Sequence, residues 1–356
     1  VSLDKAMLIQ LIGSAIAISV LVAIAAWARI ARPTAPLDAA ALGALLAEEF
    51  PDHHPTATWI SADGAGALAR DGDLALVLWR RGDGYVARDV AWSVVARARS
   101  KAGRLALRLA DAAGEAIRPF FRADYTSESK ADASPVTEAD RAAETAMRRL
   151  LDAEAPRDGV HGEEFGVKEG TTGRTWVLDP IDGTVSFMAG RPIFGTLIAL
   201  LEDGWPVLGI IDQPIGRERW VGAAGKGTTF NGTPVHVRTC AELANATLAS
   251  TSPNLFSEEG GHRFMSLAAK TAHNRLVWGG DCYNYGLLAS GQIDLVVESG
   301  LKLHDFAALV PIVDGAGGLM CDWAGDPLHA ASDGEVIALG DPARLDDVVE
   351  ALACAH

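Results

Sequence analysis

Six consecutive residues near the middle of the chain have the types and spacing of a metal-binding loop, DPIDGT at 179–184. Asp179 and Asp182 stand three apart across Pro180, which fixes its own φ and has no backbone N–H. A turn of this kind can aim both carboxylates and the Ile181 carbonyl at one point, and Mg²⁺ prefers such oxygen ligands. Two ions about 4 Å apart can stabilise the attacking and leaving oxygens of an in-line displacement. Taken alone, the block has a surface turn as its alternative.

Residues on both sides of this block complete a candidate site for a phosphate ester. Gly183 lets a phosphate approach the backbone, and Thr184 can start a helix whose free N–H groups bind an anion. Upstream, Glu163 in a GEE motif can bind a metal ion and orient a water molecule. Downstream, Asp305 opens an apolar helical segment, where it is either a helix N-cap or a further metal ligand. The combination predicts metal-dependent phosphate chemistry.

These motifs resemble the inositol monophosphatase family. The resemblance covers residues 104–356 and is carried by GEE at 162–164, WVLDPIDGT at 176–184, and the segment 298–305 followed by GAGG at 315–318. It implies an α/β fold, a layered α-β-α-β-α sandwich, and a Mg²⁺-dependent phosphate-monoester hydrolase with two or three ions per site. In such an enzyme a metal-activated water attacks phosphorus directly, without a covalent phosphoenzyme. We also expect a small-molecule phosphate monoester as substrate and a homodimer.

The resemblance implies a role for each residue of the site. The catalytic residues are Glu163, Thr184 and Asp179. The metal ligands are Glu163, Asp179, the Ile181 carbonyl, Asp182 and Asp305, with Asp140 near a further metal position. The phosphate-binding residues are Gly183, Thr184 and Lys130.

The segments PIFGTLIAL at 192–200 and GGDCYNYG at 279–286 are most similar to the histidinol-phosphatase branch of the family. Histidinol phosphate carries an amine and an imidazole, so its pocket should offer carboxylates. Asp281 and Glu298 are the candidates, and Tyr283 either lines the pocket or packs in the core. Val185 stands where a basic residue is expected in many histidinol-type members. Inositol phosphate, or another small sugar or polyol phosphate, therefore stays open as the substrate.

The composition limits the domain organisation and the classes of function that are possible. The chain has 356 residues, of which 49% are hydrophobic, enough for one large domain and a smaller module. The net charge of −15 argues against a nucleic-acid partner, which would need a basic face. The four cysteines show no CxxC spacing, which indicates reduced thiols. A non-catalytic, membrane-tethered binding protein is the alternative of another class, and the intact set of acidic residues argues against it.

The pattern along the chain predicts three parts. Residues 1–35 form a transmembrane anchor, residues 36–100 a small α+β module of unknown role, and residues 101–356 the phosphatase domain. The uncharged run at 6–28 is long enough to span a bilayer, with a buried core helix as the alternative. The basic residues Arg29 and Arg32 follow it, which predicts a cytoplasmic catalytic domain at the inner or plasma membrane. The join near residue 101 is either a true fusion or a merged gene model.

Periodicity and turn residues predict the elements around the site. Helices are expected at residues 104–121, 137–153, 304–314 and 343–355, and strands at 176–178 and 293–297. Residues 196–201 and 207–211 should pair as a hairpin. A helix at 37–50 and strands at 74–79 and 85–88 are expected in the smaller module.

The anchor can be tested directly. Alkaline carbonate extraction of membranes should leave the full-length protein in the membrane pellet, because a spanning helix is not released by washing. The protein should be followed by blot together with a known peripheral protein, which must appear in the supernatant. Complete release of the chain would exclude the anchor.

Overall fold

The computed structural model describes residues 36–60, 64, 66–81, 84–124, 127–129 and 135–353. The chain divides into two compact units, Val1–Ala102 and Gly103–His356. Helix α3 (Trp92–Ile117) contains the boundary between them. No helix in the described ranges is long and apolar enough to cross a membrane. The anchor predicted at residues 6–28 lies outside those ranges.

The first unit contains a helix and an antiparallel sheet. The helix is α2 (Ala39–Glu49), and Asp38 caps it by accepting the N–H of Ala41 at 2.7 Å. The strands follow one another in chain order: β1 (Ala57–Ile60), β2 (Gly66–Asp71), β3 (Leu74–Arg81) and β4 (Gly84–Ala91). Leu42 and Leu46 of the helix join Leu76 of β3 in one buried cluster. The helix and strands predicted for this segment are confirmed.

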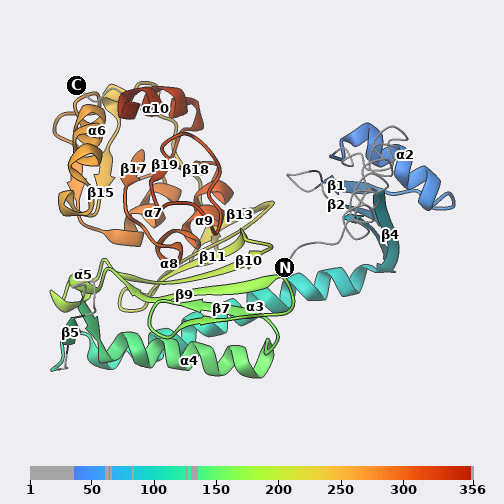
Figure 1. Ribbon diagram of the computed structural model, residues 1–356, viewed down its shortest axis with the longest axis horizontal. Helices are drawn as coiled ribbons and strands as arrows, with labels where there is room; N and C mark the ends of the chain where they lie inside the picture. Colours follow the sequence, from blue (N-terminus) through green and yellow to red (C-terminus); the bar gives the residue numbers. More distant parts are fainter. Residues whose placement is uncertain are drawn as a thin grey trace, which may run out of the picture. The chain divides into compact units, whose positions relative to one another are not determined.

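The second unit stacks helices and sheets in alternating layers (Figure 1). One outer layer holds the C-terminal half of α3 together with α4 (Glu138–Glu154). In the described part of the chain, the large sheet has eight strands in the order β14 (Thr233–Pro234), β13 (Lys226–Phe230), β12 (Glu218–Ala223), β11 (Trp205–Gln213), β10 (Gly195–Glu202), β9 (Arg174–Asp182), β7 (Gly159–Gly162) and β8 (Gly166–Lys168).

A middle layer of helices separates the large sheet from a smaller one. It contains α7 (Asp281–Ala289), α8 (Leu303–Phe306) and α9 (Leu309–Gly315). The smaller sheet has the order β16 (Leu276–Trp278), β15 (Leu248–Ser250), β17 (Leu295–Glu298), β19 (Val336–Leu339) and β18 (Leu319–Cys321). Helices α6 (Glu258–Ala268) and α10 (Leu345–Ala353) form the other outer layer (Figure 1). This is the α-β-α-β-α order that the sequence predicts.

Short elements complete the described part. They are the ribbon of β5 (Ser127–Ser129) and β6 (Pro135–Thr137), helix α5 (Thr184–Met188), and 3₁₀ turns at Arg118–Phe120, Leu243–Asn245, Pro253–Leu255 and Pro342–Arg344. Cys240, Cys282 and Cys321, which lie in the described residues, are free and buried.

Strand β9 differs from the prediction in a way that matters for the site. The acidic block was expected to be a turn after the strand, but β9 continues through Asp182. Opposite β10, Asp182 pairs with Gly195 and Asp179 pairs with Leu197, so β9 carries one extra residue there. This is a β-bulge, and Pro180 lies in it, where its missing N–H costs no ladder hydrogen bond.

Two further predictions have different outcomes. The hairpin of β10 and β11 is confirmed, and its two-residue turn, Asp203 and Gly204, has φ of 49° and 87°, the left-handed conformation that suits such turns. The single helix expected at 304–314 is wrong, because two helices, α8 and α9, occupy this range.

The large sheet and the middle helices approach each other at glycines. A Cβ on Gly222 of β12 would lie 2.2 Å from the carbonyl oxygen of Pro311, and one on Gly209 of β11 would lie 1.9 Å from that of Ala308. Because the atoms met are backbone, they cannot swing aside. The close contact of α9 with this sheet therefore depends on the absence of side chains at these positions.

The substitution Gly222→Ala should lower the free energy of unfolding by about 1–3 kcal/mol or more, because overpacking forces the sheet and α9 apart. The matched control is Gly103→Ala in α3, where nothing lies within 4 Å of the added Cβ. That control should be neutral or stabilising by up to about 1 kcal/mol, as alanine favours helix. Urea unfolding of both variants checks this, and a Gly222→Ala protein as stable as the parent would contradict it.

Candidate metal centre

Acidic side chains from distant parts of the sequence gather at one place in the second unit. Three groups each bring their ligand atoms within 4.8 Å of one another. The groups are Asp179, Asp182 and Asp305; Asp140, Glu163 and Glu164; and Glu163, Asp179 and His304. Because Glu163 and Asp179 each belong to two groups, the three form one continuous cluster.

The β-bulge explains how Asp179 and Asp182 come together. In a regular strand, residues three apart point to opposite faces of the sheet. The extra residue in β9 changes this alternation, and both carboxylates approach the same point. Thr196 fixes the bulge by donating its Oγ1 hydrogen to the carbonyl of Pro180 at 2.8 Å. The two aspartates, three residues apart in the sequence, are therefore brought together by a bulge in β9.

A buried glutamate on α4 holds the GEE turn. The carboxylate of Glu144 accepts the N–H groups of residues 164 and 165 at 2.7 and 3.2 Å, and Arg148 donates its Nε to it at 2.7 Å. A Cβ on Gly162 would lie 1.8 Å from the same carboxylate, so a side chain there would displace Glu144 from the turn. Glu144 thereby fixes the backbone that presents Glu163.

Asp140 combines a structural bond with an unused oxygen. Its Oδ2 accepts the N–H and the hydroxyl of Thr137 at 2.8 and 2.5 Å, the capping box that the sequence predicts at the start of α4. Its Oδ1 is buried and has no hydrogen-bond partner. Burial raises the pKa of Asp140 to about 6. An oxygen of this kind suits a cation.

The aspartates of the cluster are held by backbone donors and repel one another. The N–H of Cys282 donates to Asp182, and that of Lys302 donates to Asp305, both at 2.6 Å. Burial raises the pKa of Asp179 and Asp182 well above the ordinary value, and neighbouring carboxylates raise both further. Asp179 Oδ1 is buried without a hydrogen-bond partner. Such crowded, undersatisfied carboxylates fit one or more divalent cations, which would offset their charge.

Gly183 and Thr184 lie at the end of β9 beside Asp281. Gly183 has φ of 87°, a left-handed conformation that favours glycine. A Cβ there would also lie 2.7 Å from Asp281 Oδ2, so a side chain would push against Asp281. Thr184 donates its hydroxyl to the carbonyl of Ile181 at 3.0 Å. Ser186 donates to Asp281 Oδ2 at 3.1 Å. The segment expected to hold phosphate thus touches a residue expected to hold substrate.

The candidate substrate residues have different surroundings. Burial raises the pKa of Asp281 to about 6. Glu298 is 2% exposed, and both its oxygens accept hydrogen bonds, one from Thr251 and the other from the hydroxyl of Tyr285. Tyr283 donates its hydroxyl to Glu218 of β12, away from the acidic groups. Asp281 therefore adjoins the cluster, whereas Glu298 is enclosed and Tyr283 faces the large sheet.

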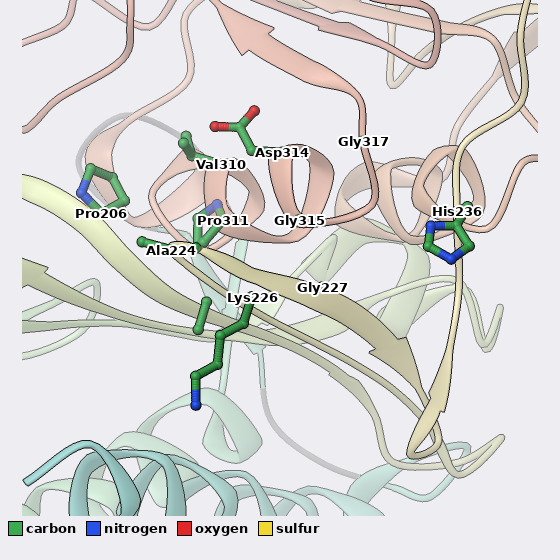
Figure 2. Close-up of a pocket in the computed structure, with 12 residues that line it drawn as sticks. Pro206, Ala224, Lys226, Gly227, His236, Val310, Pro311, Asp314, Gly315 and Gly317 are labelled. Carbon is green, nitrogen blue, oxygen red and sulfur yellow. The ribbon is translucent and has the colours of Figure 1, made fainter. Parts of the chain in front are cut away.

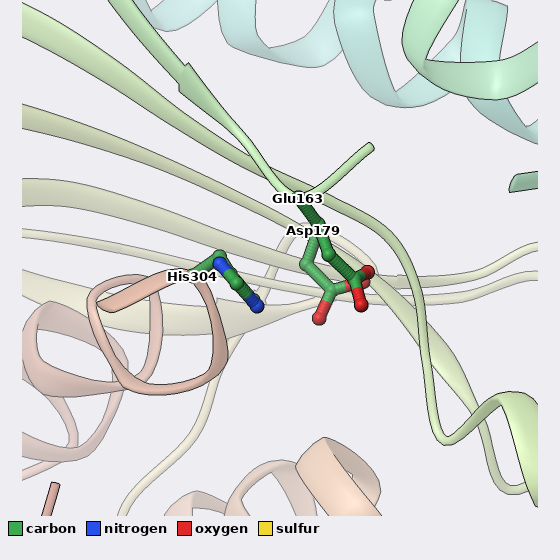
Figure 3. A group of neighbouring side chains, drawn as sticks. All are labelled: Glu163, Asp179 and His304. Carbon is green, nitrogen blue, oxygen red and sulfur yellow. The ribbon is translucent and has the colours of Figure 1, made fainter. Parts of the chain in front are cut away.

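Sequence reasoning missed His304, Glu164 and Glu144. His304 directly precedes Asp305, and this adjacency was the available signal. Figure 3 shows its ring beside the carboxylates of Glu163 and Asp179. Nothing in the sequence indicates the role of Glu144, because that role depends on the packing of α4 against the turn after β7. Lys130, predicted to bind phosphate, lies outside the described residues.

A cleft of about 480 Å³ lies elsewhere, where β12 and β13 meet α9 (Figure 2). Its charged residues include Lys226 and Asp314, and Figure 2 shows these side chains pointing in different directions. Asp314 accepts the N–H of Met320 at 3.1 Å. The cleft contains none of the metal-binding groups, so the acidic cluster is the better candidate site.

Comparison with known proteins agrees with this geometry. Residues 100–355 match the profile of the inositol monophosphatase family. The chain belongs to this family. It is a phosphomonoesterase, so the non-catalytic alternative is wrong, and the family's use of a divalent metal agrees with the acidic cluster.

Several relatives of this family member have assigned names. The bifunctional phosphatase IMPL2, chloroplastic, of Arabidopsis thaliana is 47% identical over 253 residues, covering 68% of this chain and 72% of that protein. The histidinol-phosphatase of Mycobacterium tuberculosis is 42% identical over 221 residues, covering 60% and 84%. A solved structure of an inositol monophosphatase from Zymomonas mobilis is 56% identical, with a TM-score of 0.65, covering 70% of this chain and 96% of that one.

Asp179→Asn should abolish turnover without unfolding this phosphomonoesterase. The metal-free variant should be at least as stable as the parent, because one buried like charge is gone. The parent should gain about 2.7 kcal/mol in a divalent ion at 100 times its Kd, and the variant should gain little. Thermal unfolding with and without Mg²⁺ measures both. The control Asp314→Asn, which removes a carboxylate outside the cluster, should keep the metal response. Near-normal activity of Asp179→Asn would contradict the proposed metal centre.

Proposed function

We propose that the chain hydrolyses histidinol phosphate with Mg²⁺ as cofactor. The observation that carries the proposal is Asp281, whose carboxylate lies against Gly183 at the segment expected to hold phosphate. A carboxylate there suits a substrate whose phosphate is linked to a cationic amine and an imidazole. Relatives named histidinol-phosphatase, 38–42% identical to this chain, support the same substrate.

The all-oxygen group of Asp179, Asp182 and Asp305 suits Mg²⁺. A divalent ion bound there would lower the pKa of a coordinated water and would offset the charge of the phosphate. The three groups, linked through Glu163 and Asp179, support the expectation of two or three ions. The Ile181 carbonyl, which already accepts the hydroxyl of Thr184, is the backbone ligand in this proposal.

The chain's own residues then divide the remaining work. Glu163 accepts a proton from the attacking water, and the turn fixed by Glu144 holds its carboxylate in place. The hydroxyl of Thr184 donates its hydrogen to the Ile181 carbonyl. The lone pairs of the Thr184 oxygen then accept a hydrogen bond from the same water. The N–H groups of Gly183 and Thr184 bind phosphate oxygens. Water attacks phosphorus directly while the ester P–O bond breaks, and the leaving alkoxide takes a proton from solvent to give the free alcohol. The reaction therefore needs no nucleophilic side chain.

Inositol phosphate is the second candidate substrate. Val185 follows the DGT segment and is 69% exposed, so an apolar side chain stands at the surface where a basic one is expected in histidinol-type members. The solved structure from Zymomonas mobilis, described as an inositol monophosphatase, also favours this alternative. The homodimer, the cytoplasmic location with an anchor in residues 6–28, and a separate role for residues 36–100 stay predictions.

Purified full-length protein should show a higher kcat/KM for histidinol phosphate than for inositol 1-phosphate. Asp281→Asn should lower kcat/KM for histidinol phosphate by about tenfold or more, because a charged hydrogen bond is worth about 1.5–3 kcal/mol. The loss for inositol 1-phosphate should be smaller. Asp314→Asn, which removes another carboxylate of raised pKa, should leave kcat/KM unchanged for both substrates. Equal losses for both substrates in Asp281→Asn would reject its role in substrate choice.

A further inference from the structure

His304 lies inside the acidic cluster although nothing in the proposed function uses it. It is the second residue of α8, directly before Asp305, and its side chain is 7% exposed. A ring nitrogen of His304 and carboxylate oxygens of Glu163 and Asp179 all lie within 4.8 Å of one another. Figure 3 shows the imidazole reaching from α8 toward the two carboxylates, which come from the other side of the site.

The hydrogen bonding of this imidazole is incomplete. Its Nδ1 is buried and has no hydrogen-bond partner, and its Nε2 lies 3.5 Å from Asp305 Oδ1. Leaving a buried polar nitrogen without a hydrogen bond is unfavourable. The ring of His161 lies nearby, with centroids 6.2 Å apart and planes tilted by 53°, a packing contact and not a hydrogen bond. The protein thus places a buried histidine with an unpartnered ring nitrogen beside the carboxylates of Glu163 and Asp179.

The three groups of the cluster differ in their donor atoms. Asp179, Asp182 and Asp305 offer oxygen alone, as do Asp140, Glu163 and Glu164. The group with His304 offers one nitrogen and two carboxylates. Imidazole suits Zn²⁺ and similar transition metals, whereas purely oxygen sites suit Mg²⁺, Ca²⁺ and Mn²⁺. The donor sets therefore point to different ions at neighbouring positions.

We propose that His304 is a nitrogen ligand of the metal centre, and that the position formed by Glu163, Asp179 and His304 selects a transition-metal dication such as Zn²⁺ or Co²⁺ over Mg²⁺. The inference rests on the proposed metal centre and adds a second kind of ion to it. Mg²⁺ keeps the all-oxygen position of Asp179, Asp182 and Asp305. Asp179 lies between the two positions and contributes to both.

Calorimetric titration of the metal-free full-length protein with Zn²⁺ and, separately, Mg²⁺ tests the selectivity. His304→Gln should weaken Zn²⁺ binding by about tenfold or more, because losing even an outer-shell partner of a ligand typically costs about that much. It should change Mg²⁺ binding by less than about threefold. The matched control is His161→Gln, the neighbouring imidazole outside the metal-binding groups, which should change both affinities by less than about threefold. Equal weakening of both ions by His304→Gln, or no weakening of Zn²⁺, overturns the proposal.

X-ray absorption of the unmutated protein with one equivalent of Zn²⁺ tests the ligand itself, whether or not the variant folds. The expected spectrum contains an imidazole nitrogen at about 2.0–2.1 Å. That signature should be lost in His304→Gln and kept in His161→Gln. An all-oxygen shell in the unmutated protein overturns the role of His304 alone. Failure of the unmutated protein to bind either ion in the titration overturns the metal centre of the proposed function as well.

Discussion

The site depends on holding several carboxylates close together away from water, an arrangement that is unfavourable by itself. Burial and mutual repulsion raise the pKa of Asp179 and Asp182, which means that the charged form needs help from outside the cluster. Backbone N–H groups at the starts of α7 and α8 supply part of that help. The layered sandwich brings these two helix starts to the end of β9, and a bound cation would supply the rest.

The sequence was most informative where a feature is local. The helix at Glu138–Glu154 was predicted almost to its ends, because the capping box of Thr137 and Asp140 marks its start within a few residues of chain. The hairpin of β10 and β11 followed from the turn residues Asp203 and Gly204. The residue types of the metal site were also visible, since Glu163, Asp179 and Asp182 stand close to glycines in two short motifs.

Features that depend on packing could not be obtained from the sequence. The DPIDGT block resembled a turn, because the partner strand that turns it into a bulge lies in a separate segment. Glu144 is an ordinary member of an amphipathic helix until the GEE turn is placed against it. Glu298 was a plausible substrate contact, but its enclosure by Thr251 and Tyr285 depends on the smaller sheet and α7. His304 was hidden for the same reason.

The start of α7 contributes both to the proposed substrate pocket and to the proposed metal centre. The side chain of Asp281 lies against Gly183, and the next residue, Cys282, donates its backbone N–H to Asp182. A shift of this helix start that reshapes the proposed substrate pocket would also move a donor to a carboxylate of the proposed metal centre. A change of substrate choice made at this position would therefore also change the affinity for the ion.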